Sequence, residues 1–150
     1  MATITGPLDQ PAGSDRLEGF RTALAAHGLT DVPHVQGDFS QAGGEQAMEQ
    51  LLKDHPDLDG VFVASDLMAQ GAIPVLRDLG RRIPEDVAVI GFDDSSAAMV
   101  TRPPLTTVRQ PVEDMAAEMA RLLIGHAGRG SQPRTTAVVF EPTLVIRESA

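Results

Sequence analysis

The chain has 150 residues, 42% of them hydrophobic and 22% charged, which suits a single globular domain. Its 21 acidic and 12 basic residues leave a net charge of −9, which argues against nucleic-acid binding by this chain alone, because such binding needs Lys and Arg to neutralise phosphates. The absence of cysteine excludes a disulfide framework and a thiolate site, and no apolar run reaches the roughly 18 residues that a membrane-spanning helix needs. The first residues also lack the pattern of a secretion signal, so we expect a soluble, cytoplasmic protein.

The amino-terminal part predicts a short strand followed by a helix. The run Ala2–Thr5 is typical of a strand, and a Gly-Pro pair breaks it. Ser14 or Asp15 can cap the helix that follows, and Gly28 can end it in a left-handed conformation. The inward face of this helix is expected to carry Leu17, Phe20 and Leu24.

A weaker strand and a second helix come next. Val32–Val35 has some strand character, although the run is short. Ser40 is a candidate N-cap for the helix after it, and Pro56 closes that helix. The buried stripe of this helix is expected to consist of Ala47, Met48, Leu51 and Leu52.

Two apolar runs in the middle of the chain predict buried parallel strands. Val61–Ala64 and Val87–Ile90 are continuous rather than alternating, as in strands that are covered on both faces. The segment between them predicts a helix that is capped by Ser65 or Asp66 and ends at Gly80, which makes a βαβ unit. Its inward positions are expected to be Leu67, Ala72, Leu76 and Leu79.

A long irregular stretch separates this unit from the last helix. Phe92–Pro104 is rich in small residues, and loops of this length within a compact domain are often functional. Leu105–Val108 favours a further short strand, and Pro111 suits the first turn of a helix. That helix would carry a broad apolar stripe of Val112, Met115, Ala116, Met119, Leu122 and Leu123.

The chain closes with a flexible connection, Gly125–Arg134, and two β runs, Thr136–Phe140 and Thr143–Arg147. The alternation of strands and helices along the whole chain predicts an α/β fold with a doubly wound, mainly parallel sheet. Helices on both faces of such a sheet give a three-layer αβα architecture. Ligands bind beyond the carboxyl ends of the strands in open parallel sheets, and here two of those ends carry Ser65-Asp66 and Asp93-Asp94.

Six segments carry a family resemblance, in one order and at one approximate spacing. They are ITGP followed by DRLEGFRTAL, then GDFS, VFVASDLMAQGA, IPEDVAVIGFDD and RPPLTTVRQP. Together they resemble the lactose/galactose-repressor (LacI/GalR) family of bacterial transcription regulators, and the resemblance extends from Ile4 to Arg147. It implies a sugar-binding core of the periplasmic binding protein-like I type, in which crossing strands join two lobes.

The same resemblance implies how this chain is organised. Residues 1–150 would form a single effector-binding lobe, whereas the DNA-binding helix-turn-helix and the first lobe of a full member would be absent. Residues 111–147 would cross to that first lobe or pack on it. The implied partners are a sugar-like small polar effector and a second copy in a homodimer, with operator DNA contacted only through the helix-turn-helix. The implied role is effector sensing without catalysis.

Matching the motifs residue by residue suggests the effector contacts. Arg16, in the DRLEGF segment, would grip a polar group of the effector with its planar guanidinium. Phe39, in GDF, would lie against a sugar ring, and Asp93, in GFDD, would accept hydrogen bonds from sugar hydroxyls. Ser65 stands where many members have Asn, so it would contact the effector with a small hydroxyl in place of an amide.

Other residues near this site have a structural interpretation. Asp66 is expected to take part in capping the helix, and Asp94 to stabilise the following loop through an Asx turn. Pro74 departs from the family pattern, because it lies inside the helix that members often use for dimer contacts and is expected to kink it. No metal site or cofactor is expected, because the four histidines show no ligand-like spacing.

Two other functional classes compete with the regulator. The first is the sugar-binding lobe of a transport-type binding protein, which shares this fold; the missing secretion signal argues against it. The second is a phospho-acceptor or Mg²⁺-dependent phosphatase-like domain centred on strand-end aspartates. Neither its usual DxD start nor a strand-end lysine is evident, and motifs for nucleotide binding or nucleophilic catalysis are missing.

Overall fold

A computed structural model describes residues 1–127 and 137–150 of the chain. The described part forms one six-stranded sheet in the order β2-β1-β3-β4-β5-β6. All neighbouring strands are parallel except β5 and β6, which are antiparallel. The strands are β1 (Ala2–Thr5), β2 (His34–Gln36), β3 (Gly60–Val63), β4 (Ala88–Asp93), β5 (Thr106–Arg109) and β6 (Thr143–Val145).

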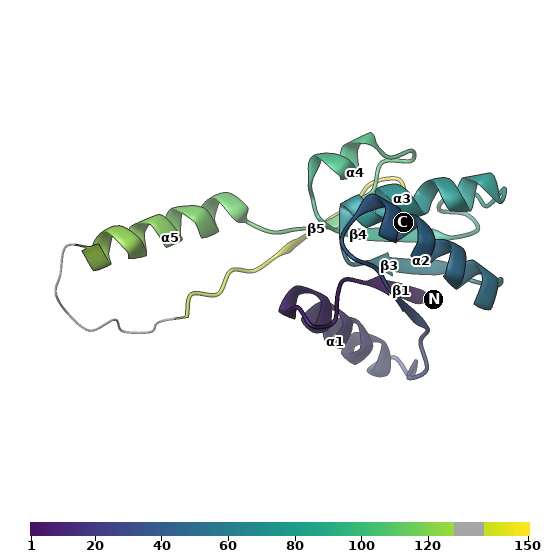
Figure 1. Cartoon of the computed structure of the whole chain (residues 1–150), viewed down its shortest axis with the longest axis horizontal. Coiled ribbons are helices and arrows are strands. Elements are labelled where there is room, and N and C mark those ends of the chain that lie inside the picture. The colour runs from purple at the N-terminus through teal and green to yellow at the C-terminus, as the bar shows by residue number, and fades with distance from the viewer. Residues whose placement is uncertain (128–136) are drawn as a thin grey trace.

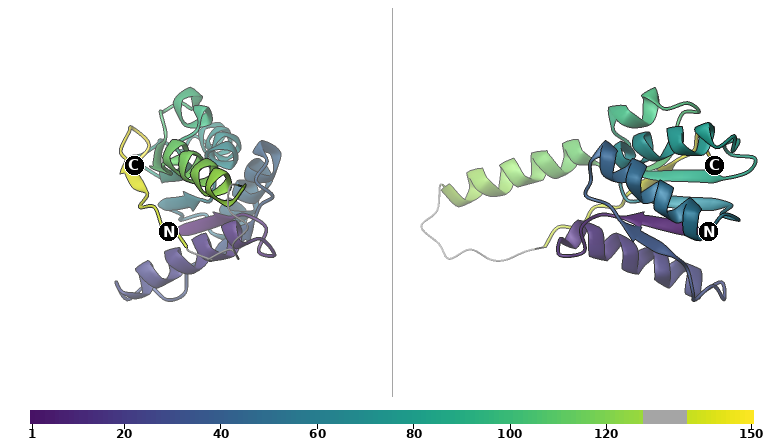
Figure 2. Two further views of the ribbon diagram at one scale, coloured as in Figure 1. Left: turned by 90° about the vertical axis from the view of Figure 1, so that its left-hand side faces the viewer. Right: turned by 45° about the vertical axis from the view of Figure 1, so that its right-hand side comes forward.

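Helices lie on both faces of the sheet. Helix α1 connects β1 to β2 at one edge of the sheet, whereas α2 and α3 connect β2 to β3 and β3 to β4 in the opposite direction. Because such crossovers are right-handed, α1 lies on one face of the sheet and α2 and α3 lie on the other. Figure 1 and Figure 2 show α1 across the sheet from that pair. The helices are α1 (Pro11–Ala25), α2 (Gln41–Asp54), α3 (Asp66–Asp78), α4 (Ser96–Val100) and α5 (Val112–Ala127). The predicted doubly wound, mainly parallel α/β fold is therefore confirmed.

The core lies between the sheet and the α2–α3 layer, where two glycines allow the helices to touch. A Cβ atom added at Gly71 would lie 1.9 Å from the carbonyl oxygen of Gln41, and one added at Gly44 would lie 2.1 Å from that of Met68. Backbone therefore packs on backbone along this contact. The large side chains that are fully buried include Ile4, Met48, Leu51, Met68, Ile73, Leu76, Val63, Val89 and Leu105.

Helix α5 stands apart from this core. Figure 1 shows it extending away from the sheet at the end of β5, and β6 leads the chain back. Its predicted apolar stripe is largely exposed: Met119 is 63% exposed and Leu123 is 70% exposed. The connection predicted at Gly125–Arg134 lies mostly outside the described residues.

Several predicted details are wrong at the ends and faces of elements. Helix α1 begins at Pro11 rather than after Ser14 or Asp15, because proline suits the first helical position, and the Ser14 hydroxyl instead bonds back to the Gln10 carbonyl. Leu67 in α3 and Leu79 directly after it are exposed rather than inward. The inward stripe of α3 starts one residue later and consists of Met68, Ala69, Ala72, Ile73 and Leu76.

The irregular stretch and the last β runs also differ from the prediction. Phe92–Pro104 contains the end of β4 and the short helix α4, which the Ser95 hydroxyl caps through the N–H of Ala97. Within the run predicted at Thr136–Phe140, residues 137–140 form no strand, and Thr136 lies outside the described residues. Only the run at Thr143–Arg147 pairs with the sheet, as β6.

The close α2–α3 contact generates a stability prediction. Replacing Gly71 by Ala should lower the free energy of unfolding by about 1–3 kcal/mol or more, because the added methyl group meets backbone that cannot move aside. The matched control is Gly19→Ala in α1, where a Cβ atom meets nothing within 4 Å and the change should stabilise by about 0.5–1 kcal/mol. Urea denaturation followed by circular dichroism measures both, and a Gly71→Ala protein as stable as wild type would contradict the packing described.

Candidate functional site

The candidate site lies at the carboxyl edge of the parallel strands. The register pairs Phe62 with Ile90 and Asp93 with Arg109, so the ends of β3, β4 and β5 come together at this edge. The polar residues that follow these ends, from three separate stretches of sequence, therefore become neighbours. Helix α1 adds Arg16 from the second turn of its span.

Arg16 is held at the edge by two fixed partners. One guanidinium nitrogen donates to the carbonyl oxygen of Ala64 at 2.5 Å, and the other lies 3.3 Å from Oδ1 of Asp93. Its Cζ atom sits 3.9 Å from the centroid of the Phe92 ring, a cation–π contact. Burial lowers the pKa of Arg16, and the nearby Asp93 carboxylate offsets part of that effect. The guanidinium is thus oriented before any ligand arrives.

Asp93 is the acceptor at the centre of the cluster. Its Oδ1 accepts a hydrogen bond from Nε2 of Gln110 at 2.8 Å, in addition to the longer contact with Arg16. Burial raises the pKa of this carboxyl group, although Arg16 and Gln110 act in the opposite direction. The side chain is still 35% exposed, so the carboxylate has a side open to a ligand. A ligand hydroxyl group that donates to this carboxylate would replace hydrogen bonds to water that burial has removed.

Sequence reasoning missed Gln110. It follows β5 directly, and its amide joins that strand exit to the carboxylate at the end of β4. The available signal was its position: a polar residue just beyond a strand that lies next to β4 in the sheet. That neighbourhood depends on the strand order, which no local pattern of the sequence encodes.

Two aromatic rings flank Arg16. Besides Phe92, the ring of Phe39 lies 5.9 Å from the Arg16 Cζ atom. Phe39 packs over Gly6, where an added Cβ atom would lie 2.0 Å from the ring, so only glycine leaves room for it. Phe39 thereby presents a ring beside the guanidinium, and its contact with a sugar ring stays a prediction.

Backbone strain is concentrated at the same edge. Phe39, Asp93 and Asp94 have φ values of 66°, 111° and 53°, which side-chain-bearing residues rarely adopt. Conformations of this kind cost about 1–3 kcal/mol each and tend to persist at functional sites, where the surroundings hold them. Two of these three residues are predicted effector contacts, which supports a functional role for the edge.

Ser65 and Asp66 connect the site to the fold. The Ser65 hydroxyl accepts the N–H of Met68 and caps α3, so its proton is what remains to offer a ligand. Asp66 is fully buried; it accepts the Thr107 hydroxyl at 2.6 Å and the Ser95 N–H at 2.7 Å. Burial raises the pKa of Asp66, whereas these hydrogen bonds lower it. Asp66 therefore holds three segments of the edge together.

Asp94 turns away from the cluster and binds two arginines. Its oxygens accept hydrogen bonds from Nε of Arg109 and from a terminal nitrogen of Arg147, each at 2.5 Å. Burial alone would raise the pKa of Asp94, but the bonds from Arg147 and Arg109 prevail and hold it below its usual range. Asp94 therefore stabilises the edge through these two arginines and not through the predicted Asx turn.

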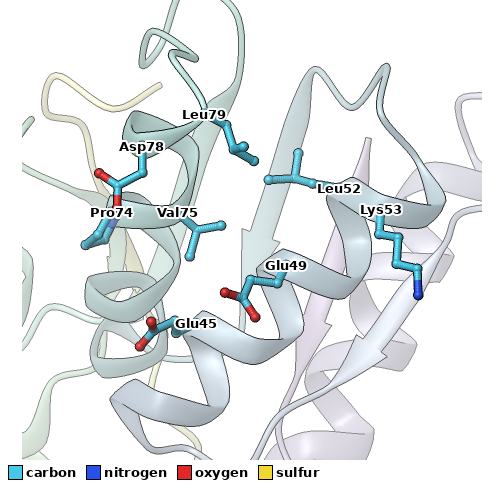
Figure 3. A pocket seen from close by; sticks show the side chains of 8 residues that line it. All are labelled: Glu45, Glu49, Leu52, Lys53, Pro74, Val75, Asp78 and Leu79. Atoms are coloured by element: carbon cyan, nitrogen blue, oxygen red, sulfur yellow. The ribbon is translucent and has the colours of Figure 1, made fainter.

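Two of the hollows among the described residues lie near the elements of this site. One, of about 410 Å³, lies beside Arg16 and is lined mainly by Phe20, Phe62 and Phe92. The other, of about 420 Å³, lies between α2 and α3, where the carboxylates of Glu45 and Glu49 point into the groove (Figure 3). The first is continuous with the Arg16 cluster, whereas the second belongs to the surface of the helical layer.

The chemistry of the cluster is that of binding. It offers a carboxylate acceptor, guanidinium and amide donors and two aromatic faces, the combination that holds a polyhydroxylated ring. Within residues 1–127 and 137–150, no group of three acidic or histidine side chains is placed to hold a metal ion. Across the same residues, no helix is both long enough and apolar enough to cross a membrane.

Comparisons with known proteins identify the family to which this fold belongs. The family model of the periplasmic binding protein-like domain matches residues 1–150. The HTH-type transcriptional regulator CelR of Thermobifida fusca is 50% identical over 152 residues, which cover 99% of this chain and 44% of that protein. The chain thus spans less than half the length of this relative.

Solved structures give the same result. A structure titled transcriptional regulator CelR–cellobiose complex superposes with a TM-score of 0.93 at 49% identity, covering 99% of this chain and 46% of that one. The lac repressor dimer bound to operator and the anti-inducer ONPF superposes with a TM-score of 0.86 at 28% identity, covering 99% of this chain and 51% of that one. The chain therefore belongs to the periplasmic binding protein-like domain family, and it corresponds to the effector-binding part of LacI-type transcriptional regulators.

Proposed function

We propose that this chain is the sugar-sensing lobe of a cytoplasmic transcriptional regulator and that it binds its effector without catalysing a reaction. The observation that carries the proposal is the cluster of Arg16, Asp93 and Gln110 at the carboxyl edge of the sheet. Phe39 would cover one face of the sugar ring, and the Ser65 hydroxyl would donate one further hydrogen bond. A second lobe outside residues 1–150 would supply the remaining contacts.

The printed title of one similar structure suggests the effector class. CelR is described there in complex with cellobiose, and the two chains are 49% identical over 99% of this one. We therefore expect a β-linked glucose disaccharide or a related sugar to bind here. A two-dimensional NMR titration of the chain with cellobiose, ribose and galactose tests this, and the lack of any saturable shift near Arg16 and Gln110 with any sugar would refute it.

The transport-type binding protein is the competing candidate. It shares the fold, and a lobe of that kind would also bind a sugar at this edge. The similarity to regulators at 50% identity favours sensing over transport. In a regulator the effector would bias the relative orientation of two lobes and thereby the DNA-bound state, through a helix-turn-helix outside residues 1–150.

A second copy of the chain is the proposed protein partner. Exposed apolar side chains occur on α3, directly after it and on α4: Leu67, Leu79, Met99 and Val100 are between 44% and 63% exposed. The groove of Figure 3 borders the same helix, and Pro74 lies in its wall. One similar structure is described as a lac repressor dimer. Together these observations support a homodimer through α3 and the Ser96–Pro104 segment.

Residues 111–147 would cross to the second lobe in the complete protein. The exposure of α5 supports this proposal, because an apolar helix of this kind normally finds a partner. In the chain by itself, α5 would instead associate with another copy.

The first prediction from substitutions in the site concerns Arg16. Arg16→Lys keeps the positive charge but loses the planar fork, so it should weaken sugar binding about 10- to 100-fold, the value of one or two hydrogen bonds to a charged group. Arg21→Lys in the same helix is the matched control and should bind as wild type does. NMR titration gives both dissociation constants, and equal affinity of Arg16→Lys and wild type would remove Arg16 from the site.

The second prediction concerns pH. Asp93 accepts sugar hydroxyls only when it is ionised, and burial raises its pKa, so affinity should be full above that raised pKa and fall as the pH drops through it. Asp93→Asn should bind more weakly at pH 7 and lose this pH dependence. Asp57→Asn, in an exposed loop, should keep it. Sugar affinity that is constant from pH 7 down to acid unfolding would show that Asp93 makes no such bond.

The third prediction concerns α5. Met115→Asp with Met119→Asp should reduce association of the chain, because both charges fall on its apolar stripe. Light scattering measures the mass, with Leu29→Asp as the control at an exposed leucine outside α5. If the double variant keeps the mass and solubility of wild type, α5 is not an association surface.

A further inference from the structure

Two adjacent carboxylates at the end of β4 are bound by two adjacent residues at the end of β5. Asp93 accepts a hydrogen bond from Gln110. Asp94 accepts one from Arg109, the residue that precedes Gln110. Asp93 and Arg109 are also paired in the β4–β5 register. The two bonds therefore form a double clip, Asp93–Gln110 and Asp94–Arg109, across the point where the chain leaves the sheet toward α5.

A third contact brings the returning chain into the same clip. Arg147, just beyond β6, donates to Asp94 and also to the carbonyl oxygen of Leu105 at 2.7 Å. Its backbone N–H donates to the Thr106 hydroxyl at 2.9 Å. The Asp94 side chain is only 8% exposed and the Arg147 side chain 15%. Asp94 thus holds both strands that connect the lobe to α5, in a position largely protected from water.

The backbone between the two carboxylates explains why they act together. Asp93 and Asp94 have φ values of 111° and 53°, so their side chains diverge from one strained dipeptide. Such a conformation persists only while its surroundings hold it, and the two arginines on Asp94 are the strongest ties available there. Without them the dipeptide would be free to relax, and the Asp93 carboxylate would leave the place where it meets Gln110 and Arg16.

Charge adds a second reason. Removing the Asp94 carboxylate would leave Arg109 and Arg147 without their shared anion, next to the Asp93 carboxylate. Asp93 would then be drawn to these arginines and away from a neutral sugar hydroxyl, because an ion pair attracts it more strongly. The same substitution would therefore free the Asp93 carboxylate from its place beside Gln110 and draw it toward the two arginines.

We propose that Asp94 is a positioning residue of the effector site: by clamping Arg109 and Arg147 it holds Asp93 and Gln110 together, and it couples effector binding to the two strands that lead to α5. This inference rests on the proposed sugar-sensing function. An effector that tightens the bonds of Asp93 and Gln110 would fix the exit of β5, and with it the direction of α5. A change in the α5 arm would in turn alter the site.

The decisive experiment follows the side-chain amide of Gln110 by NMR, with no sugar present. In wild type its NH₂ signals should be shifted from those of exposed Gln10, because one N–H donates to a carboxylate. In Asp94→Asn these signals should move to the position of Gln10. Asp86→Asn is the matched control, since it also removes a carboxylate from an arginine pair, on a distant surface loop. An Asp94→Asn protein that folds and keeps the wild-type Gln110 signals would overturn the proposal.

A milder variant keeps the test decisive if Asp94→Asn fails to fold. Arg109→Gln removes one half of the clip at a 55% exposed side chain and leaves Asp94 paired with Arg147. In this variant the Gln110 NH₂ signals should move toward the position of Gln10, and in Arg109→Lys they should move only part of the way. Arg121→Gln, in an exposed pair on α5, should leave them at the wild-type position. Unchanged Gln110 signals in a folded Arg109→Gln protein would also overturn the proposal.

Sugar titration then separates this inference from the function on which it rests. Cellobiose affinity should fall about two- to thirtyfold in Arg109→Gln, the usual range for a residue that acts through its neighbours. A wild-type chain that binds no sugar of the panel would refute the proposed function, whereas the Gln110 signals still decide the clip. If the Gln110 signals of Arg109→Gln move to the position of Gln10 but its sugar affinity is unchanged, Asp94 positions nothing that the effector uses, and the inference fails.

Discussion

The buried carboxylate of Asp66 is the contact on which the rest of the binding edge depends. It is fully buried at the start of α3 and binds the Thr107 hydroxyl of β5 and the backbone N–H of Ser95 before α4. Burial raises its pKa, and the two donors act in the opposite direction, so its hydrogen bonds and its charge depend on each other. Through this one group, β3, β5 and the loop after β4 are held in the arrangement that brings the effector-binding side chains together.

The neighbouring pair Asp93 and Asp94 shows how environment divides identical side chains between two roles. Asp93 meets one guanidinium at 3.3 Å and one amide, remains partly exposed, and has a raised pKa because burial prevails. Asp94 meets two guanidinium groups at 2.5 Å, is nearly buried, and has a lowered pKa because those bonds prevail. An incompletely paired carboxylate suits a ligand, whereas a fully paired one suits a structural tie.

Much of the fold followed from local patterns. The continuous apolar runs at Val61–Ala64 and Val87–Ile90 predicted parallel strands. Strand β3 lies within one residue of its run at both ends, and β4 starts within one residue of its run but extends three residues further, to Asp93. The faces of helices were harder, as Leu67 and Leu79 in and after α3 show. Periodicity locates a stripe only to within about one residue, which is enough to turn a side chain from the core to solvent. Arg16 and Phe39 were selected through the family resemblance, because nothing in their local sequence distinguishes them from surface residues.

The sequence by itself determined the class of fold, the alternation of its main strands and helices and the acidic net charge of the chain, since these depend on composition and on patterns within single segments. Only the tertiary structure decided which polar residues meet. Gln110 reaches Asp93, and Arg147 reaches Asp94 from 53 residues away, because the strand order sets β5 and β6 beside β4. Strand order follows from how the whole core packs, and no local pattern encodes it.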